Sequence, residues 1–431
     1  MKIQNILLVL FIVALCFSCK NENKKSIINV SVIKGTVINR DSDTLFLLKA
    51  TDDPRQDIID TIPVINGKFE HKFISDEIEM YELIFKDELM TGSFMPTRFF
   101  SENTDIVFNL YDRDNSSKFT REGGENNNLY QKYLDSIQDG YNNQLKAVYE
   151  DYNLFDSFEK FNSKEYNELF SRLREAKSQE EKVPIYQSIK KFEKTGKHRS
   201  EIGKELDSVV NVLSKQFENK KYEFIGNYPS LVSYSILMRD MQSLKYKDIP
   251  KEKIVEAYNT LSAKFPNHPY SELAKNLWIG YTELQPGGEY INFTAPDIND
   301  VDYELKPIVD KNKIVLLDLW ATWCGPCIVK SRKIRPVYET YKDKGFTIVG
   351  VAGEFKNLNA YNKFMAKEQW PWLNLIELDR ENKIWEKYNV MNGGGGMFLI
   401  DGSGKILAVD PTAEEVETIL KDKLVNNSIK L

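Results

Sequence analysis

Cysteine and histidine are scarce in this chain of 431 residues, which contains four cysteines and three histidines. The cysteines form two close pairs at opposite ends of the sequence, Cys16 with Cys19 and Cys324 with Cys327, and all three histidines precede residue 270. A structural zinc site takes about four Cys, His or carboxylate ligands. No second cysteine pair or histidine stands near Cys324 and Cys327 in the sequence, so we expect no metal and no cofactor there.

Long blocks of one charge are also missing. Lysine, arginine, aspartate and glutamate are interspersed, and the formal net charge is −6. Because the charge pattern provides no positively charged region to bind the phosphates of nucleic acids, we expect no nucleic-acid partner. A hydrophobic content of 42% and a charged content of 28% are typical of a globular protein. The length favours two or three domains.

The apolar run near the N-terminus is too short to favour a membrane-spanning helix. The run Ile6 to Phe17 is short and follows Lys2, as in a secretory signal peptide. It ends at Ser18-Cys19, which resembles the lipobox of bacterial lipoproteins, although Cys16 stands where leucine is usual. We predict a lipoprotein signal over residues 1–19, lipid on Cys19 and a tether over residues 20–25; an ordinary secretory signal is the alternative.

The predicted signal and lipid account for two of the four cysteines. If Cys16 leaves with the signal and Cys19 carries lipid, Cys324 and Cys327 are the remaining thiols. An exported protein with no scaffold of disulfides, but with one Cys-x-x-Cys pair, is expected to use that pair for chemistry.

The patterns behind the signal divide into three regions. Residues 26–122 alternate apolar and polar positions and predict a β-sandwich-like domain, with a hairpin turn at Asn66-Gly67. Residues 123–284 show apolar spacings of three and four, which predict helices. After a Pro/Gly break, residues 290–431 alternate strands with helices and end in a hairpin and a helix, which predicts an α/β domain.

The second cysteine pair follows the predicted buried strand Ile314 to Trp320 and begins a predicted helix. A helix N-terminus lowers the pKa of a cysteine, so Cys324 is expected to be the exposed attacking thiol. Cys327 faces the same side and can resolve a mixed disulfide. Gly325 and Pro326 suit the first turn, and Trp320 and Trp323 are expected to pack around the sulfurs.

The segment "WATWCGPC", with "FTAPDIND" before it and "LDRENKIWEKYNV" and "FLIDGSGKI" after it, resembles the thioredoxin superfamily. More narrowly it is similar to exported thiol-disulfide oxidoreductases of the TlpA/ResA kind, over about 140 residues. The signal, β domain and helical region in front resemble a layout common among Bacteroidetes, which implies architecture and no function. The resemblance implies a thioredoxin-like fold, protein disulfide substrates that dock beside Trp323, Gly325 and Pro326, and a membrane electron donor.

Asp318 lies in the apolar strand "IVLLDLW", where a carboxylate is costly unless it has a purpose. The resemblance implies that it takes the proton of Cys327, and burial would raise its pKa toward neutrality; a partly solvated strand end is the alternative. The resemblance also places Glu354 near the dithiol, where it tunes the cysteines or contacts a partner; a solvated loop acid is the alternative. Lys330 stands where the family usually has glutamate.

The run Gly393 to Gly396 is the largest departure from the family. Counting back from Phe398, Gly395 occupies the position of the family's cis-proline, which borders the substrate. Replacing that ring by flexible glycine predicts weaker substrate docking, and proline at residue 395 is expected to restore the wall.

The sequence thus predicts a thiol-disulfide oxidoreductase, lipid-anchored in the envelope of a Gram-negative bacterium and facing the periplasm. The direction of electron flow and the substrate stay open. The pattern Pro-x-x-x-Thr-x-x-Cys is absent around Cys324, which disfavours a peroxidase. The second interpretation is a lipoprotein that binds a partner or ligand and whose thioredoxin-like domain is redox-weak.

Overall fold

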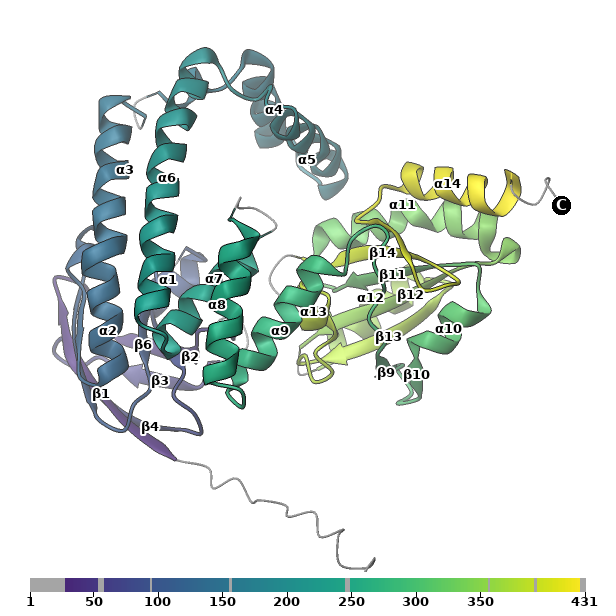
Figure 1. Cartoon of the computed structure of the whole chain (residues 1–431). Coiled ribbons are helices and arrows are strands. Elements are labelled where there is room, and N and C mark those ends of the chain that lie inside the picture. The colour runs from purple at the N-terminus through teal and green to yellow at the C-terminus, as the bar shows by residue number, and fades with distance from the viewer. Residues whose placement is uncertain are drawn as a thin grey trace, which may run out of the picture. The chain divides into compact units, whose positions relative to one another are not determined.

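The computed structural model describes residues 28–52, 58–93, 95–154, 157–244, 249–355, 357–390 and 394–426. The predicted signal, the tether and Cys19 lie outside these residues. The described residues form two compact units, which divide after Gly124. Within the described ranges, no helix combines the length and the apolar composition that crossing a membrane requires. The predicted layout of a β-rich N-terminal region, helices and an α/β domain is confirmed (Figure 1).

The first unit contains two four-stranded sheets. Their strand orders are β4-β1-β7-β8 and β3-β2-β5-β6. Inward side chains from both sheets, such as Ile33, Leu47 and Phe108, share one core, which makes this unit a sandwich. Its elements are β1 (Asn29–Ile38), β2 (Thr44–Lys49), β3 (Asp60–Pro63), β4 (Lys68–Ser75), β5 (Met80–Phe85), α1 (Lys86–Thr91), β6 (Thr97–Phe100), β7 (Asp105–Tyr111) and β8 (Thr120–Glu122).

The hairpin predicted at Asn66-Gly67 is only half right. The turn is present, because Ile65 and Lys68 bond to each other through both backbone groups, and Asn66 and Gly67 have positive φ. The strands that it connects nevertheless separate, since β3 pairs with β2 while β4 pairs with β1. The turn therefore carries the chain from one sheet to the other. A turn motif fixes the local reversal, but partners elsewhere in the chain decide the pairing.

The second unit begins with eight α-helices: α2 (Glu125–Tyr133), α3 (Asp139–Asp151), α4 (Lys164–Glu175), α5 (Gln179–Lys194), α6 (Glu201–Asn227), α7 (Leu231–Ser243), α8 (Lys251–Lys264) and α9 (Pro269–Thr282). Serine begins four of them: Ser163, Ser178, Ser200 and Ser230 each accept a backbone N–H of the first turn. Such a cap contributes about 1 kcal/mol to helix stability. Helices α4 and α5 share a small core of their own.

The α/β domain is built on a five-stranded sheet of order β13-β12-β11-β14-β15. Strand β11 pairs in parallel with β12 and antiparallel with β14. Its elements are β9 (Thr294–Pro296), β10 (Asp302–Glu304), α10 (Leu305–Lys311), β11 (Ile314–Trp320), α11 (Gly325–Tyr341), β12 (Phe346–Glu354), α12 (Asn359–Glu368), β13 (Leu373–Leu378), α13 (Ile384–Lys387), β14 (Gly396–Asp401), β15 (Ile406–Val409) and α14 (Ala413–Leu420). Strand β11 has the predicted bounds, Ile314 to Trp320, whereas β13 was not predicted.

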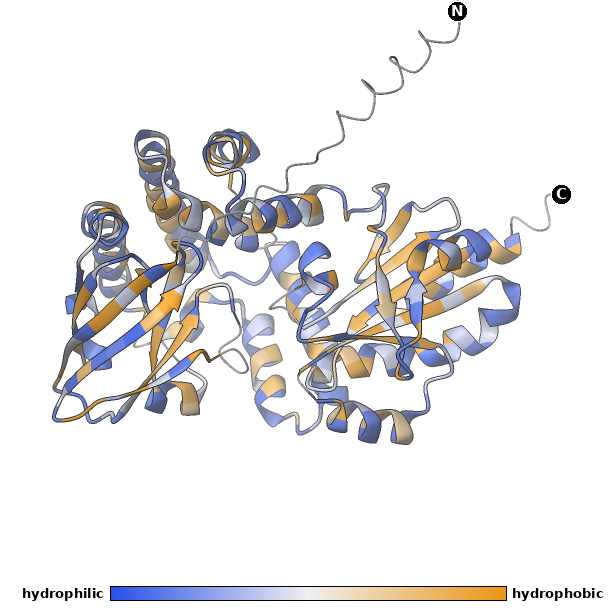
Figure 2. Cartoon of the chain, turned by 90° about the horizontal axis from the view of Figure 1, so that it is seen from below, coloured by the Kyte–Doolittle hydropathy of each residue, from blue (hydrophilic) through white to orange (hydrophobic). Residues whose placement is uncertain are grey.

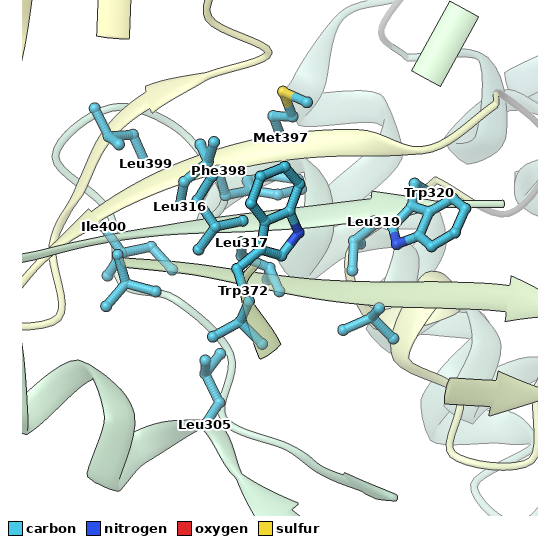
Figure 3. Packing of buried hydrophobic residues seen from close by; sticks show 14 of the residues in the cluster. Leu305, Leu316, Leu317, Leu319, Trp320, Trp372, Met397, Phe398, Leu399 and Ile400 are labelled. Atoms are coloured by element: carbon cyan, nitrogen blue, oxygen red, sulfur yellow. The ribbon is translucent and has the colours of Figure 1, made fainter. Parts of the chain in front are cut away.

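All seven residues of the central strand β11 are buried. Leu316, Leu317 and Leu319 pack with Phe398 and other apolar side chains of β14 (Figure 3). Helices α11 and α14 lie side by side against this sheet (Figure 1), and the sheet strands are mostly hydrophobic while the helices also carry hydrophilic residues (Figure 2). A strand covered on both faces is apolar throughout, so the carboxylate of Asp318 is the exception in β11.

Candidate active site

The cysteine pair lies where β11 passes into α11. Cys324 is the residue before the first helical position, and the backbone N–H of Cys327 donates to its Sγ at 3.3 Å. A disulfide joins Cys324 to Cys327, with the Cα atoms 5.3 Å apart. After reduction, the unpaired N–H groups and the positive end of the helix dipole favour a thiolate on Cys324. The strand-to-helix placement therefore suits Cys324 for the predicted role of attacking thiol.

Both cysteines are only 4% exposed, so the prediction of an exposed Cys324 is wrong for this oxidised state. The carbonyl oxygen of Gly394 lies 3.2 Å from Sγ of Cys324 and 2.7 Å from Sγ of Cys327. Helix α5 also borders the turn: a Cβ added to Gly325 would lie 3.3 Å from Cγ of Gln179. The sequence motif could not reveal the contacts of Gly394 and Gln179 with this turn, because both residues lie far from Cys324 in the sequence.

The α5 contact is accompanied by an ion pair. Arg332, on α11, binds Glu180 at 2.9 Å and Glu368 of α12 at 2.7 Å. All three side chains are at least partly solvated, so each pair contributes little alone, about 0–1 kcal/mol. The N-terminal end of α5 is thus held beside the dithiol by weak contacts.

Asp318 is 2% exposed in the middle of β11, which excludes the alternative of a solvated strand end. Its Oδ2 accepts a hydrogen bond from Oγ of Ser331 at 2.6 Å. Burial raises the pKa of this carboxyl to about 7, and the bond from Ser331 opposes the rise. A carboxyl with this pKa can exist in both protonation states near neutral pH, as a general base requires.

Glu354 is not in a solvated loop, because β12 extends to include it and it is 4% exposed. Its carboxylate accepts the backbone N–H of Thr322 at 2.7 Å and the Thr322 hydroxyl at 2.8 Å. Burial raises the pKa of this carboxyl. Glu354 therefore fixes the backbone two residues before Cys324, and positioning fits its geometry better than partner contact.

The two tryptophans before the cysteines have different surroundings. Trp320 is fully buried and contacts the rings of Tyr361, Phe364 and Trp370. Trp323 donates its Nε1–H to the carbonyl of Gly353 at 3.1 Å and stacks on Phe355. Trp320 is part of the core that supports the site (Figure 3), and Trp323 extends the wall of the dithiol turn along the end of β12.

The glycine run does not follow the path expected for Gly395. Residues 391–393 lie outside the described ranges, but Gly394 and Gly395 have φ of +79° and +73°. Proline is restricted to φ near −65°, so proline at residue 395 cannot restore the family's wall without a new backbone path. A Cβ on Gly395 would also overlap the carbonyl oxygen of Leu319 and lie 2.8 Å from Sγ of Cys327. Glycine is required at residue 395 because its φ is positive and because Leu319 and Cys327 leave no room for a side chain.

Replacing Gly395 by alanine is therefore expected to destabilise the protein. The positive φ costs about 1–2 kcal/mol for an L residue, and the overlap with Leu319 adds roughly 1–3 kcal/mol. Gly287→Ala is the matched control, because Gly287 has φ of +90° and nothing within 4 Å of an added Cβ. Chemical denaturation of both variants measures the difference; equal losses would contradict the close approach.

Lys330, the departure from the family's glutamate, lies near Asp410. Its Nζ is 3.4 Å from Oδ1 of Asp410, and the same oxygen accepts the backbone N–H of Met397 at 3.1 Å. Met397 is the β14 partner of Asp318. The positive charge of Lys330 lowers the pKa of Asp318 while the negative charge of Asp410 raises it. Lys330 thus belongs to the surroundings of the buried carboxyl.

Sequence reasoning missed Ser331, Thr322 and Asp410. Ser331 could have been found, because it follows Cys327 by four residues and so lies on the same helix face. Thr322 and Asp410 have no such local signal. Their partners, Glu354 and Lys330, are 32 and 80 residues away in the sequence.

Comparison with known proteins gives two family matches. Residues 286–409 match the AhpC/TSA family, and residues 31–130 match a domain of unknown function, DUF4369. The thiol-disulfide oxidoreductase ResA of Bacillus thuringiensis is 31% identical over 158 residues, which are 35% of this chain and 84% of ResA.

Two further proteins match a similar share of the chain. The thiol:disulfide interchange protein HelX of Rhodobacter capsulatus is 31% identical over 144 residues, 33% of this chain and 72% of HelX. The solution structure of a thiol:disulfide interchange protein from Bacteroides sp. is 24% identical with a TM-score of 0.30, covering 33% of this chain and 92% of that one. Through its C-terminal third, the chain belongs to the ResA family of thioredoxin-like thiol-disulfide oxidoreductases.

Proposed function

We propose that this protein exchanges disulfides with other proteins in the cell envelope through Cys324 and Cys327. The observation that carries the proposal is the disulfide at the start of α11, with the buried carboxyl of Asp318 on the neighbouring strand. Membership of the ResA family supports the reaction class. The predicted signal over residues 1–19 supports the location in the envelope, and the family resemblance supports protein substrates.

In the reducing direction, the Cys324 thiolate attacks one sulfur of a substrate disulfide. A mixed disulfide forms, and the other substrate sulfur leaves as a thiolate, which takes a proton from solvent. The Cys327 thiol then gives its proton to Asp318 and attacks Sγ of Cys324, which restores the disulfide and releases the second substrate sulfur as a thiolate. This thiolate takes a proton from solvent, and Asp318 returns its proton to solvent. Two electrons pass to the substrate in each cycle. A membrane dithiol donor would reduce the Cys324–Cys327 disulfide again.

The surrounding residues have supporting roles in this proposal. Trp323, Gly325 and Pro326 form the rim against which a substrate disulfide docks, and Glu354 holds Thr322 and thereby the rim. Gly395 lets the chain pass close to Cys327 without a side chain. Because Gly394 borders both sulfurs and Gln179 lies beside Gly325, we expect these groups to shift before a protein substrate reaches Cys324.

The same cover favours a second candidate function, a partner-binding lipoprotein with a redox-weak domain. Both sulfurs face the carbonyl of Gly394, and neither cysteine is more than 4% exposed. If this cover persists after reduction, the dithiol would react slowly with proteins.

Reduction of insulin by the full-length protein separates the two candidates. With dithiothreitol as electron source, the wild type is expected to accelerate insulin precipitation beyond dithiothreitol alone. The double variant Cys324→Ser/Cys327→Ser, which cannot form the disulfide, is the control and should give no acceleration. A wild type that forms the dithiol yet gives no acceleration would favour the binding protein.

Lipid on Cys19 is a separate part of the proposal. Acylation at Cys19 would place the wild type in the membrane fraction, and Cys19→Ala should release it to the soluble fraction because one or more acyl chains are lost. Mass spectrometry of the N-terminal peptide gives the acyl mass directly. Cys16→Ala is the matched control and should stay membrane-bound; a membrane-bound Cys19→Ala without acyl mass in the wild type would exclude the anchor.

A further inference from the structure

The hydroxyl of Ser331 lies between Asp318 and Cys327. Ser331 is 1% exposed on α11, one helical turn after Cys327. Its Oγ is 2.6 Å from Oδ2 of Asp318 and 3.0 Å from the backbone carbonyl oxygen of Cys327. One buried side chain thus connects the carboxyl on β11 with the helical turn that contains the second cysteine.

A hydroxyl has a single proton, so it can donate to only one of these two acceptors at a time. When Asp318 is ionised, the Ser331 hydroxyl donates to the carboxylate, and a bond to a charged acceptor is about twice as strong as a neutral one. When Asp318 is protonated, the carboxyl can donate to Oγ, and the hydroxyl is free to donate to the carbonyl of Cys327. The two bonding patterns correspond to the two protonation states of Asp318.

Other charged groups also act on this carboxyl. Lys330 of α11 favours its ionised form, and Asp410, which follows β15, disfavours it. These two lie 3.4 Å from each other and are partly solvated, so their effects partly cancel and are screened. Ser331 differs because its bond to Asp318 is direct and buried.

We propose that Ser331 is a positioning residue, which orients the Asp318 carboxyl toward the Cys327 turn and stabilises its ionised form. The proposal rests on the proposed function, in which Asp318 receives the proton of Cys327. Ser331 itself neither gains nor loses a proton over the cycle. Its removal should leave the reaction possible but move the pH at which Asp318 can act.

The test is the rate of mixed-disulfide resolution in single-turnover experiments from pH 5 to 9. Ser331→Ala should move the midpoint of the pH profile upward by about one unit, which is about a tenfold lower rate at pH 6. Ser331→Thr keeps the hydroxyl and should keep the wild-type midpoint. Ser331→Val has the shape of threonine without the hydroxyl and should behave like alanine, so this pair controls for packing.

A uniform loss of rate with an unchanged midpoint in both Ser331→Ala and Ser331→Val would overturn the proposal, because it would indicate packing alone. Titration of the Asp318 carboxyl by ¹³C NMR gives the same midpoint without turnover and extends the test to variants that react too slowly to measure. The proposed function fails differently: if Asp318→Asn keeps the wild-type profile, Asp318 is not the base at all.

Discussion

Replacing Cys327 by serine is expected to trap the protein in covalent complexes with its substrates. Cys324 can still attack, because it stands at the start of α11, but the serine hydroxyl cannot resolve the mixed disulfide. Turnover of insulin should fall to the level of the double-cysteine variant. Trapping in cell extracts followed by mass spectrometry should identify both the partners and the linking residue.

Cys324→Ser is the matched control for the trap. It keeps one thiol, Cys327, but that thiol lies three residues inside the helix and beneath the carbonyl of Gly394. We expect no complexes and no turnover from this variant. Complexes linked through Cys327 would show that the attacking and resolving roles are reversed.

Asp318→Asn is expected to slow resolution of the mixed disulfide by about 10²–10⁴-fold near neutral pH, the usual contribution of a general base. The amide has nearly the same shape as the carboxyl but cannot take the proton of Cys327. In the wild type the rate should rise as the pH passes about 7, where Asp318 ionises. In the variant the rise should move toward about 8.5, where an ordinary thiol ionises.

Asp410→Asn is the control for a general effect of removing a negative charge near the site. Asp410 is half-exposed and bonded to Lys330 and Met397, so its loss should leave the rate within a few-fold of the wild type. An Asp318→Asn variant that resolves as fast as Asp410→Asn at pH 7 would contradict the role of Asp318.

Asp318→Asn should also stabilise the oxidised protein at high pH. The folded-state pKa of about 7 lies above the unfolded value of about 3.9, so the folded protein favours the protonated carboxyl. The stability associated with this proton is complete below about pH 4 and is lost as the pH rises through 7. The difference between the folded and unfolded pKa values lowers the free energy of unfolding of the wild type by up to about 4 kcal/mol at pH 8–9, and Asp318→Asn should avoid this loss. A slower but more stable variant excludes damage to the fold.

Local patterns predicted the strands and helices that position the dithiol. The apolar run of β11, which only Asp318 interrupts, and the Gly-Pro pair at the start of α11 lie within ten residues of Cys324. These two local signals indicate the strand bounds and the helix start. The strand β13, with Asn374 interrupting its apolar residues, carries a weak signal and was missed. Burial of both faces hides the alternation that usually marks a strand.

Features that depend on contacts between distant segments could not be predicted. Glu354 reads as a loop acid from its position after "TIVGVAG", yet β12 extends to Glu354 because its backbone pairs with Leu378 of β13. Its buried carboxylate is then bonded to Thr322. The position of Gly395 was predicted by counting along the family pattern, which cannot give a φ of +73°. The contact of Gly394 with the sulfurs, and the approach of Gln179 to Gly325, likewise arise only in three dimensions.

The pH dependence of cysteine alkylation in the fully reduced protein tests the central claim most directly. Cys324 at the helix start should react first, with a thiolate pKa well below the roughly 8.5 of a free cysteine, while Cys327 reacts slowly at every pH. Mass spectrometry of the labelled peptides assigns each rate to its residue. Faster labelling of Cys327, or two cysteines that both titrate near 8.5, would contradict the assignment of Cys324 as the attacking thiol.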